Sequence, residues 1–320
     1  MVEVVAGIDI GGTNTKIGLI DRFGKTLYES SISTRSYDGI EDFIKNLSET
    51  LKSELNQHSD LKLRGVGIGA PNGNYYKGTI EYAPNLKWKG IVPIVEIFQK
   101  HINIPMILTN DANAAAIGEM VFGGAKGMKD FIIITLGTGL GSGIVSNGEL
   151  VYGHDGNAGE IGHSIVRYNG RQCGCGRQGC LETYASATGI KRTVYKLLAD
   201  QLNDSLLRSI SFNDLTAEMI TKAALEGDKI AIAAFEYTAK HLGRKLSDAV
   251  THTSPEAIFL FGGLTNAGDL ILNPTRKYFE DNLLEIYKGK VKILFSELNG
   301  TNAAVLGAAA LMYKELEKSI

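Results

Sequence analysis

The stretch VVAGIDIGGTNTKIGLI, residues 4–20, decides the fold. Apolar residues dominate Val4 to Ile10 and Thr15 to Ile20 around Gly11-Gly12-Thr13-Asn14, which predicts a strand, a glycine turn and a second strand. Glycines have no Cβ, so their backbone N–H groups can approach anionic oxygens closely. The segment, which also carries Asp9 and Lys16, predicts a phosphate-binding hairpin or an ordinary glycine hairpin, and the phosphate loop GxxxxGK[ST] occurs nowhere in the chain.

The pattern around this hairpin predicts a mixed α/β layer architecture. A turn at residues 22–25 leads into a third strand near Thr26 to Ser33, and apolar residues at helical spacing predict a helix over 39–58. Buried strands are expected at 64–68 and 106–109, with a helix near 93–101 between them. The resulting order βββαβαβ combines antiparallel strands with strands connected through helices.

The opening unit recurs in the middle of the chain. An apolar strand at 131–135, a turn containing Gly137, Thr138 and Gly139, and a strand at 142–145 repeat it. The turn is not a dinucleotide fingerprint, because a strand follows it where that motif requires a helix, so a second phosphate hairpin fits better. Two copies of one unit predict two lobes that face each other across a cleft, residues 1–114 with 303–320 and residues 115–302.

The remaining sequence is mainly helical. Helices are predicted at 185–202, 216–225, 229–251 and 267–286, with strands at 257–261 and 291–295. An Ala-rich last helix at 303–317 is expected to return to the first lobe. Gly262 and Gly263 follow a buried strand, where the backbone could pack against a purine or ribose, although a strand-to-helix turn also favours glycine.

The composition excludes several classes of protein. The 320 residues carry a formal net charge of −2 with no basic arm, so nucleic acid is not an expected partner. No signal-peptide pattern opens the chain and no apolar run approaches the length of a membrane span, so we expect a cytoplasmic protein without a membrane partner. Glycine is frequent, with 38 residues against 6 prolines, and it clusters in the motifs described here rather than in linkers.

Thr109-Asn110-Asp111-Ala112-Asn113 marks the point where an apolar strand ends and an Ala-rich helix begins. One interpretation is that Asp111 or Asn113 caps the N-terminus of this helix. The other is that Asp111 accepts a hydroxyl proton during phosphoryl transfer, with Asn110 orienting the same substrate. The local sequence leaves both open.

The most specific feature is His163 followed by Cys173, Cys175 and Cys180. One imidazole and three thiolates form a complete tetrahedral zinc shell, which is typical of a structural site without an open position for catalysis. The alternative is three unliganded thiols. Glu160 and Glu182 flank this cluster, and their carboxylates could accept hydrogen bonds from sugar hydroxyls, although a single glutamate is most often a solvated surface residue.

Five segments taken together resemble the ROK family of repressors, open reading frames and kinases: DIGGTNTK (9–16), TNDANAA (109–115), LGTGLGSG (136–143), GEIGH (159–163) and CGCGRQGCLE (173–182). The resemblance implies the two-lobed actin-like, ribonuclease-H-like ATPase fold of the hexokinases, with central mixed sheets and a structural zinc knuckle. It also implies an ATP-dependent sugar kinase that uses Mg²⁺, binds structural Zn²⁺ and forms a homodimer or higher homo-oligomer.

The resemblance implies roles for individual residues. Asp111 corresponds to the catalytic base, and the sugar contacts correspond to Asn85, Asn110, Asp111, Glu160, His163 and Glu182. His163 would bind zinc through one ring nitrogen and the sugar through the other. The phosphates and magnesium would meet Asp9, Gly11, Gly12, Thr13, Lys16, Gly137, Thr138 and Gly139, and the adenosine would meet Gly262 and Gly263.

Glucose is the favoured substrate by resemblance to the glucokinase members, with N-acetylmannosamine, N-acetylglucosamine and fructose as alternatives. A sugar-sensing regulator is a second class, but only eight residues precede Asp9, too few for the expected DNA-binding module. A catalytically silent sugar-binding protein and an actin-like ATPase without a small-molecule acceptor are further alternatives. One departure from many relatives is Asn72 in Gly69-Ala70-Pro71-Asn72-Gly73, where they have glycine, and asparagine also tolerates a left-handed backbone.

Overall fold

The computed structural model describes residues 1–298 and 303–318, and the chain divides into two compact units. Unit 1 comprises Met1–Met128, Leu150–Gly159 and, as far as it is described, Glu297–Ile320; unit 2 comprises Lys129–Glu149 and Glu160–Ser296. The expected boundary at 114 falls inside helix α3 (Asp111–Phe122), which belongs wholly to unit 1 because it packs on helix α8 (Ala303–Lys318). The expected limit at 302 lies outside the described residues. The division into two functional lobes, residues 1–114 with 303–320 and residues 115–302, stays a prediction.

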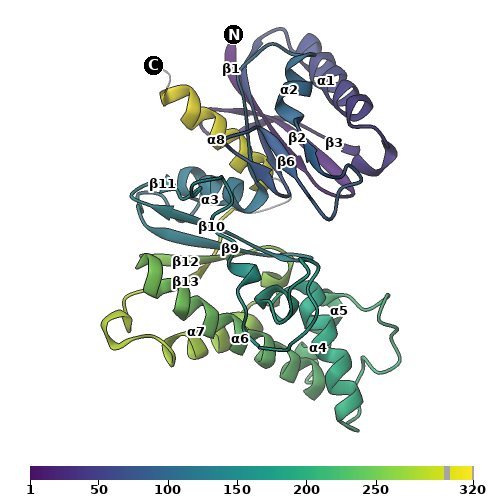
Figure 1. The fold of residues 1–320 in the computed structure, drawn as a ribbon, viewed down its shortest axis with the longest axis vertical. Helices are drawn as coiled ribbons and strands as arrows, with labels where there is room; N and C mark the ends of the chain where they lie inside the picture. Colours follow the sequence, from purple (N-terminus) through teal and green to yellow (C-terminus); the bar gives the residue numbers. More distant parts are fainter. Residues whose placement is uncertain (299–302, 319–320) are drawn as a thin grey trace. The chain divides into compact units, whose positions relative to one another are not determined.

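Unit 1 is built on a five-stranded mixed sheet of order β3-β2-β1-β4-β8 (Figure 1). The strands are β1 (Val2–Ile10), β2 (Asn14–Asp21), β3 (Thr26–Ser33), β4 (Leu61–Ala70) and β8 (Met106–Asn110). The three consecutive strands β1 to β3 pair antiparallel, while β1–β4 and β4–β8 pair parallel across helical connections. The mixed α/β architecture predicted from the sequence is therefore confirmed. Helices α1 (Ile40–Gln57) and α2 (Ile94–Gln99) and the short strands β5 (Gly73–Asn74), β6 (Thr79–Glu81) and β7 (Ile91–Val92) complete the unit.

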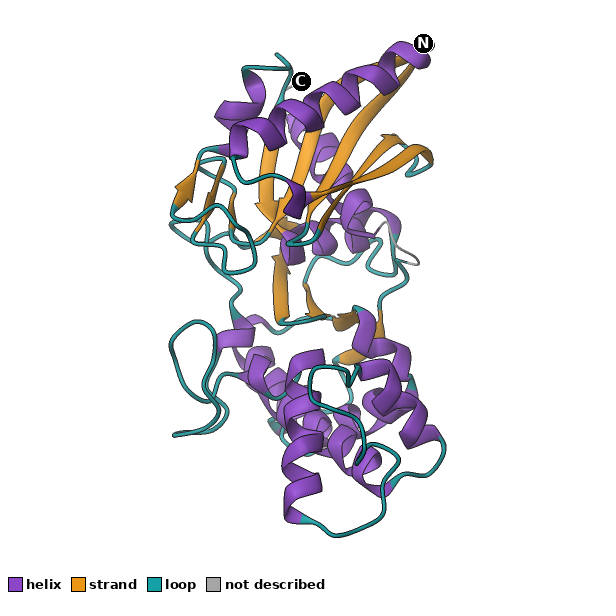
Figure 2. Ribbon diagram, turned by 90° about the vertical axis from the view of Figure 1, so that its right-hand side faces the viewer, coloured by secondary structure: helices purple, strands orange, loops and turns teal. Residues whose placement is uncertain are grey.

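The alternation of side chains along β1 assigns each face of this sheet to a helix. Val4, Ala6 and Ile8 belong to a core with the apolar face of α1, whereas Val5 belongs to a core with α8. Helices accordingly cover the strands of unit 1 in Figure 2. On the α8 side the sheet carries glycine where a helix backbone comes very close: a Cβ on Gly67 would lie 1.8 Å from the Ala308 carbonyl oxygen. Only glycine permits this approach, which holds α8 and its partner α3 against the sheet.

Unit 2 repeats the strand order of unit 1 (Figure 1). Its sheet has the order β11-β10-β9-β12-β13, with β9 (Phe131–Leu136), β10 (Leu140–Ser146), β11 (Glu149–Leu150), β12 (Ala257–Phe261) and β13 (Lys292–Phe295). The pair β9–β10 is antiparallel, as β1–β2 is, and β9–β12–β13 are parallel, as β1–β4–β8 are. The internal repeat read from the two glycine turns thus extends to the topology of both sheets.

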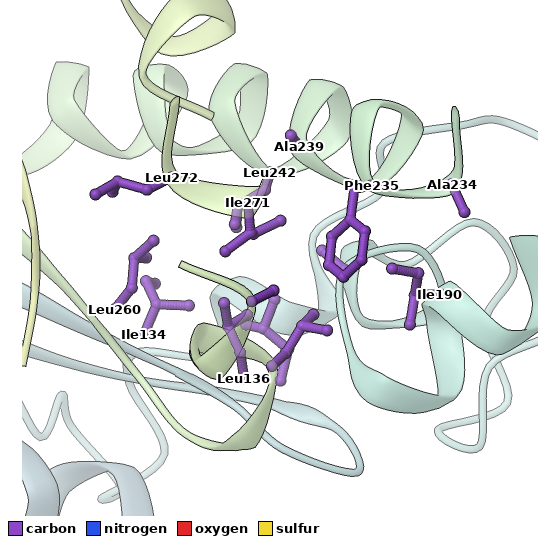
Figure 3. Close-up of a cluster of buried hydrophobic side chains, with 14 of the residues drawn as sticks. Ile134, Leu136, Ile190, Ala234, Phe235, Ala239, Leu242, Leu260, Ile271 and Leu272 are labelled. Atoms are coloured by element: carbon purple, nitrogen blue, oxygen red, sulfur yellow. The ribbon is translucent and has the colours of Figure 1, made fainter. Parts of the chain in front are cut away.

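Helices α4 (Ala187–Asp200), α5 (Ala217–Leu225), α6 (Lys229–Thr253) and α7 (Asp269–Glu280) form the helical part of unit 2. Its core joins the sheet to these helices: Figure 3 shows Ile134 and Leu260 of the sheet, Phe235 of α6 and Ile271 of α7 in one cluster. Each of these four side chains is at most 1% exposed. Burial of this order is the main favourable term in forming the unit.

Most predicted elements lie within a few residues of the observed ones, and the largest difference is the helix expected over 267–286. Observed α7 ends at Glu280, after which Asn282 donates to the Phe279 carbonyl three residues back, as in a tighter turn. Within the described ranges 1–298 and 303–318, none of the helices combines the length and the apolar character that crossing a membrane requires.

Candidate functional site

The first glycine turn connects β1 and β2 in unit 1. The Gly11 N–H donates to the Asn14 carbonyl at 3.0 Å, which closes the turn, and the Thr13 carbonyl accepts from the Thr34 N–H at 2.9 Å. A Cβ on Gly12 would lie 2.5 Å from the Asn85 carbonyl oxygen. The structure thus packs Asn85, which is distant in sequence, directly against the turn.

Two carboxylates lie close to this turn, those of Asp9 and Asp111. Asp9 is near the end of β1 and opposite Lys16 of β2 in the strand register. The pKa of Asp9 is raised to about 6, mainly by burial and also by the nearby Asp111 charge, while Lys16 acts in the opposite direction. Two neighbouring carboxylates repel one another, and binding a proton or a cation relieves this repulsion.

Asp111 is the first residue of α3. It keeps accessible surface, yet desolvation by the surrounding protein raises the pKa of its carboxyl, while the Ala112 N–H, at 2.8 Å from Oδ1, acts in the opposite direction. A carboxylate with a raised pKa is a stronger base than an ordinary aspartate. The geometry therefore suits acceptance of a proton.

The capping interpretation of Asp111 and Asn113 is wrong, because Asn110 occupies the N-cap position. The Asn110 Oδ1 atom accepts from the Ala112 N–H at 2.8 Å. Asn113 lies on the buried side of α3, and its Oδ1 atom has no hydrogen-bond partner among the described residues. The cap uses only the Oδ1 atom of Asn110. The sequence therefore predicted a cap at this helix but assigned it to the wrong residues.

The His163, Cys173, Cys175 and Cys180 side chains of unit 2 converge as expected. Their ligand atoms all lie within 4.8 Å of one another, with His163 Nδ1 3.6 Å from Cys173 Sγ and Cys175 Sγ 3.7 Å from Cys180 Sγ. Zinc bonds of about 2.3 Å to sulfur and about 2.0 Å to nitrogen in a tetrahedron place the ligand atoms roughly 3.6 to 3.8 Å apart. The two measured pairs have this spacing, so the cluster gathers the four ligand atoms that a zinc ion requires.

Glycine turns and Arg171 shape the segment around this cluster. A Cβ on Gly179, whose φ is +81°, would lie 1.8 Å from the Arg167 carbonyl oxygen. The Arg171 guanidinium donates to the Thr183 carbonyl at 2.7 Å and lies 4.6 Å above the Tyr184 ring. The role of Arg171 could not be predicted, since nothing in the local sequence separates an anchoring arginine from a surface one.

His163 and Glu160 are paired beside the cluster. The His163 Nε2 atom lies 3.8 Å from Glu160 Oε2, so one ring nitrogen faces the thiols and the other faces a carboxylate. The Glu160 side chain is 53% exposed, which leaves it accessible to a ligand. The arrangement suits a histidine that has a different partner at each nitrogen.

Glu182 is not a solvated surface residue. Its Oε2 atom accepts from the Leu140 N–H at 3.0 Å, directly after the second glycine turn, and its Oε1 atom lies 3.6 Å from Cys173 Sγ. A Cβ on Gly139 would lie 2.3 Å from Glu182 Oε2. The structure thus joins the cysteine segment to the turn, a contact that no spacing in the sequence indicates.

The second glycine turn also lies beside Gly262. A Cβ on Gly262, whose φ is +106°, would lie 2.8 Å from the Leu136 carbonyl oxygen at the end of β9. Thr138 is exposed, and the space where Gly137 and Gly263 would carry a Cβ is open. Unit 2 therefore brings together the glycines that were expected to face phosphates and those expected to face adenosine.

The turn at Asn72 has the left-handed backbone that glycine would provide. Asn72 has a φ of +52°, and its Nδ2 atom donates to the Glu81 carbonyl at 2.9 Å. The departure from the Gly-x-Pro-Gly pattern thus leaves the turn intact.

Comparison with known proteins places these features in a family. Residues 5–315 match the family described as "ROK family". A glucokinase of Halalkalibacterium halodurans is 35% identical over 319 residues, covering 98% of this chain and 96% of that protein. A xylose repressor of Caldicellulosiruptor bescii is 30% identical over 98% of this chain and 79% of that protein. The crystal structure of a ROK family glucokinase from Streptomyces griseus, in complex with glucose and AMPPNP, matches with a TM-score of 0.80 and 33% identity, covering 96% of this chain and 98% of that one. The resemblance inferred from five sequence motifs is confirmed, and the chain belongs to the ROK family.

Proposed function

We propose that this chain is an ATP-dependent hexose kinase, with glucose as its first candidate substrate. The observation that carries the proposal is the Asp111 carboxylate, with a raised pKa, beside Asp9 and the first glycine turn of unit 1. The proposal is supported by the glucokinases among the relatives and by the glucose and AMPPNP in the related structure. A cytoplasmic location, where ATP is available, and a homo-oligomeric state belong to the same proposal.

Asp111 acts as the base in the proposed reaction. Its carboxylate accepts the proton of the sugar hydroxyl, and the hydroxyl oxygen forms a bond to the γ-phosphorus of ATP. The bond from that phosphorus to the bridging oxygen breaks, and ADP leaves with the electron pair. Desolvation raises the pKa of Asp111, which makes the carboxylate a better proton acceptor.

The other residues bind and orient the substrates. In unit 1, Asn85 and Asn110 contact the sugar, while the first glycine turn and Lys16 bind phosphates. In unit 2, Glu160, His163 and Glu182 contact the sugar, the turn at 137–139 binds phosphates, and Gly262 and Gly263 contact adenosine. Each glycine turn offers backbone N–H groups, which suit anionic oxygens.

Two metal ions complete the proposal. Asp9 is the residue we assign to Mg²⁺, which neutralises charge on the phosphates when it is bound. His163, Cys173, Cys175 and Cys180 would hold Zn²⁺, which would have a structural role. His163 then positions its second nitrogen beside Glu160 for the sugar.

The test is ADP release measured over glucose, fructose, N-acetylmannosamine and N-acetylglucosamine. We expect the highest kcat/KM with glucose, and a loss of at least about 1,000-fold in kcat for Asp111→Asn with both substrates still bound. Asp42→Asn is the matched control, since Asp42 is an exposed residue in the first turn of α1 and its replacement should leave kcat unchanged. Sugar binding without ADP release in the wild-type protein would reject the kinase and favour a sugar sensor. Near wild-type turnover of Asp111→Asn would remove the base assignment.

A further inference from the structure

We propose that Glu182 is a positioning residue for the second glycine turn, so that the cysteine segment sets the nucleotide-binding geometry as well as the sugar pocket. The inference rests on the proposed kinase function for its meaning, but its structural basis lies wholly within unit 2. Glu182 follows Cys180 by two residues. Its carboxylate accepts a hydrogen bond from the backbone N–H of Leu140, one residue beyond Gly139.

The turn itself has few internal constraints. The Gly137 N–H donates to the Gly139 carbonyl at 3.1 Å, and the space where a Gly137 Cβ would lie is open. Three consecutive residues with two glycines have many accessible conformations, and ordering them costs backbone entropy. External contacts must therefore hold the turn if its N–H groups are to be ready for phosphate.

The cysteine segment and the residues around it provide those contacts. The Ala187 N–H donates to the Gly137 carbonyl at 2.9 Å, and the Leu140 N–H donates to Glu182 at 3.0 Å. On the following strand, Ser142 Oγ accepts from the Ile161 N–H at 3.1 Å. The turn is thus held at both ends, and of these three contacts the one from Glu182 comes from an ionisable side chain.

Glu182 is itself held in place from the cysteine side. Its carbonyl accepts from Ser186 Oγ at 2.8 Å, and Ser186 Oγ caps α4 by accepting from the Gly189 N–H at 3.0 Å. Its Oε1 atom lies 3.6 Å from Cys173 Sγ, one of the four expected zinc ligands. A displacement of the cysteine segment would therefore be transmitted to Leu140 through one side chain.

Gly139 provides the second, steric half of the inference. With Glu182 in place, a Cβ at Gly139 would lie 2.3 Å from Oε2, far inside contact distance. The glycine at this position is then required by Glu182 rather than only by a bound phosphate. Removing the Glu182 carboxylate should make an alanine at 139 tolerable.

The first experiment measures hydrogen exchange of residues 136–142 in the ligand-free protein, which needs no assumption about activity. We expect Glu182→Ala to accelerate exchange of this segment at least fivefold and Glu182→Gln, which keeps an acceptor oxygen, to restore most of the protection. Glu160→Gln is the matched control and should leave the segment unchanged. Removal of zinc with a chelator, followed by metal analysis, should reproduce the Glu182→Ala effect. Unchanged exchange in Glu182→Ala would overturn the inference.

The second experiment measures AMPPNP binding by calorimetry in the absence of sugar. Glu182→Ala and Gly139→Ala should each weaken binding about tenfold, and the double variant should be no weaker than either, because the clash and the hydrogen bond involve the same carboxylate. Additive losses would show that Gly139 and Glu182 act independently and would overturn the steric half. A wild-type chain that binds no AMPPNP would defeat the kinase proposal, while the exchange result would still decide the role of Glu182.

Discussion

Replacing Asp9 by asparagine should stabilise the magnesium-free protein at neutral pH. In the folded chain the pKa of Asp9 is raised from 3.8 to about 6, so the fold favours the protonated carboxyl. The stabilisation from that proton is complete below the unfolded pKa near 4 and is lost as the pH rises through about 6. Above pH 6 the fold holds a carboxylate that is partly desolvated and close to Asp111, and asparagine removes this cost.

The size of the effect follows from the pKa. At roughly 1.4 kcal/mol per pKa unit, the rise corresponds to at most about 3 kcal/mol. Residual exposure and solvent screening reduce this, and we expect the Asn variant to gain about 1 to 2 kcal/mol at pH 7.5. The gain should shrink as the pH falls from 6 and vanish below about 4, where aspartic acid and asparagine are both neutral.

Thermal unfolding of both proteins from pH 4 to 8, in magnesium-free buffer without a chelator so that zinc stays bound, measures this gain. Adding Mg²⁺ with AMPPNP should reverse the order, because only the wild-type protein has the carboxylate that we assign to the cation. Asp38→Asn is the control of opposite sign, since Lys87 lowers the pKa of the exposed Asp38 carboxyl. A pH-independent difference in midpoint, or an Asn variant that is less stable at pH 7.5, would refute the reasoning.

Three further variants test the packing, the turn and the metal. Gly67→Ala should destabilise unit 1 by several kcal/mol, because its Cβ would lie 1.8 Å from the Ala308 carbonyl oxygen, and denaturant unfolding should show it; a loss below 1 kcal/mol would contradict the close contact. Asn72→Gly should change the free energy of unfolding by less than about 0.5 kcal/mol, since both residues accept a φ of +52° and only the hydrogen bond to the Glu81 carbonyl is lost. A large loss in the same assay would mean that this hydrogen bond matters more than the backbone conformation. Cys175→Ser should reduce bound zinc from about one per chain to a small fraction in metal analysis, and a full complement of zinc in that variant would exclude Cys175 as a ligand.

The order and type of the secondary structure could be predicted because each signal is local. The apolar run from Val4 to Ile10, the helical spacing in 39–58 and the glycines between strands all act over a few residues, and the structure follows them closely. The small sheet of β5, β6 and β7 was missed, since its two- and three-residue strands are too short to show a period. The end of α7 was misplaced because helical spacing continues past the point where the backbone tightens.

The candidate site was predicted from residue types, and the contacts that hold it were not. A histidine with three nearby cysteines indicates zinc in any fold, because the ligand set itself is chemically specific. The packing of Asn85 on Gly12, the N-cap at Asn110 and the bond from Glu182 to Leu140 each join a side chain to a backbone atom whose position depends on the whole unit. Backbone atoms are the same at every residue, so the sequence carries no mark of such contacts.

The sequence by itself determined the two glycine turns, the mixed architecture, the metal-ligand set and the family, since these depend on residue identity and short spacing. Only the tertiary structure decided that burial and the nearby Asp111 charge raise the pKa of Asp9, and that Glu182 links the cysteine segment to the backbone of Leu140. The physical reason is that desolvation and electrostatic coupling depend on distances between atoms. Those distances are set when α3 and α8 pack on a glycine-lined sheet and when the cysteine segment folds against the second turn.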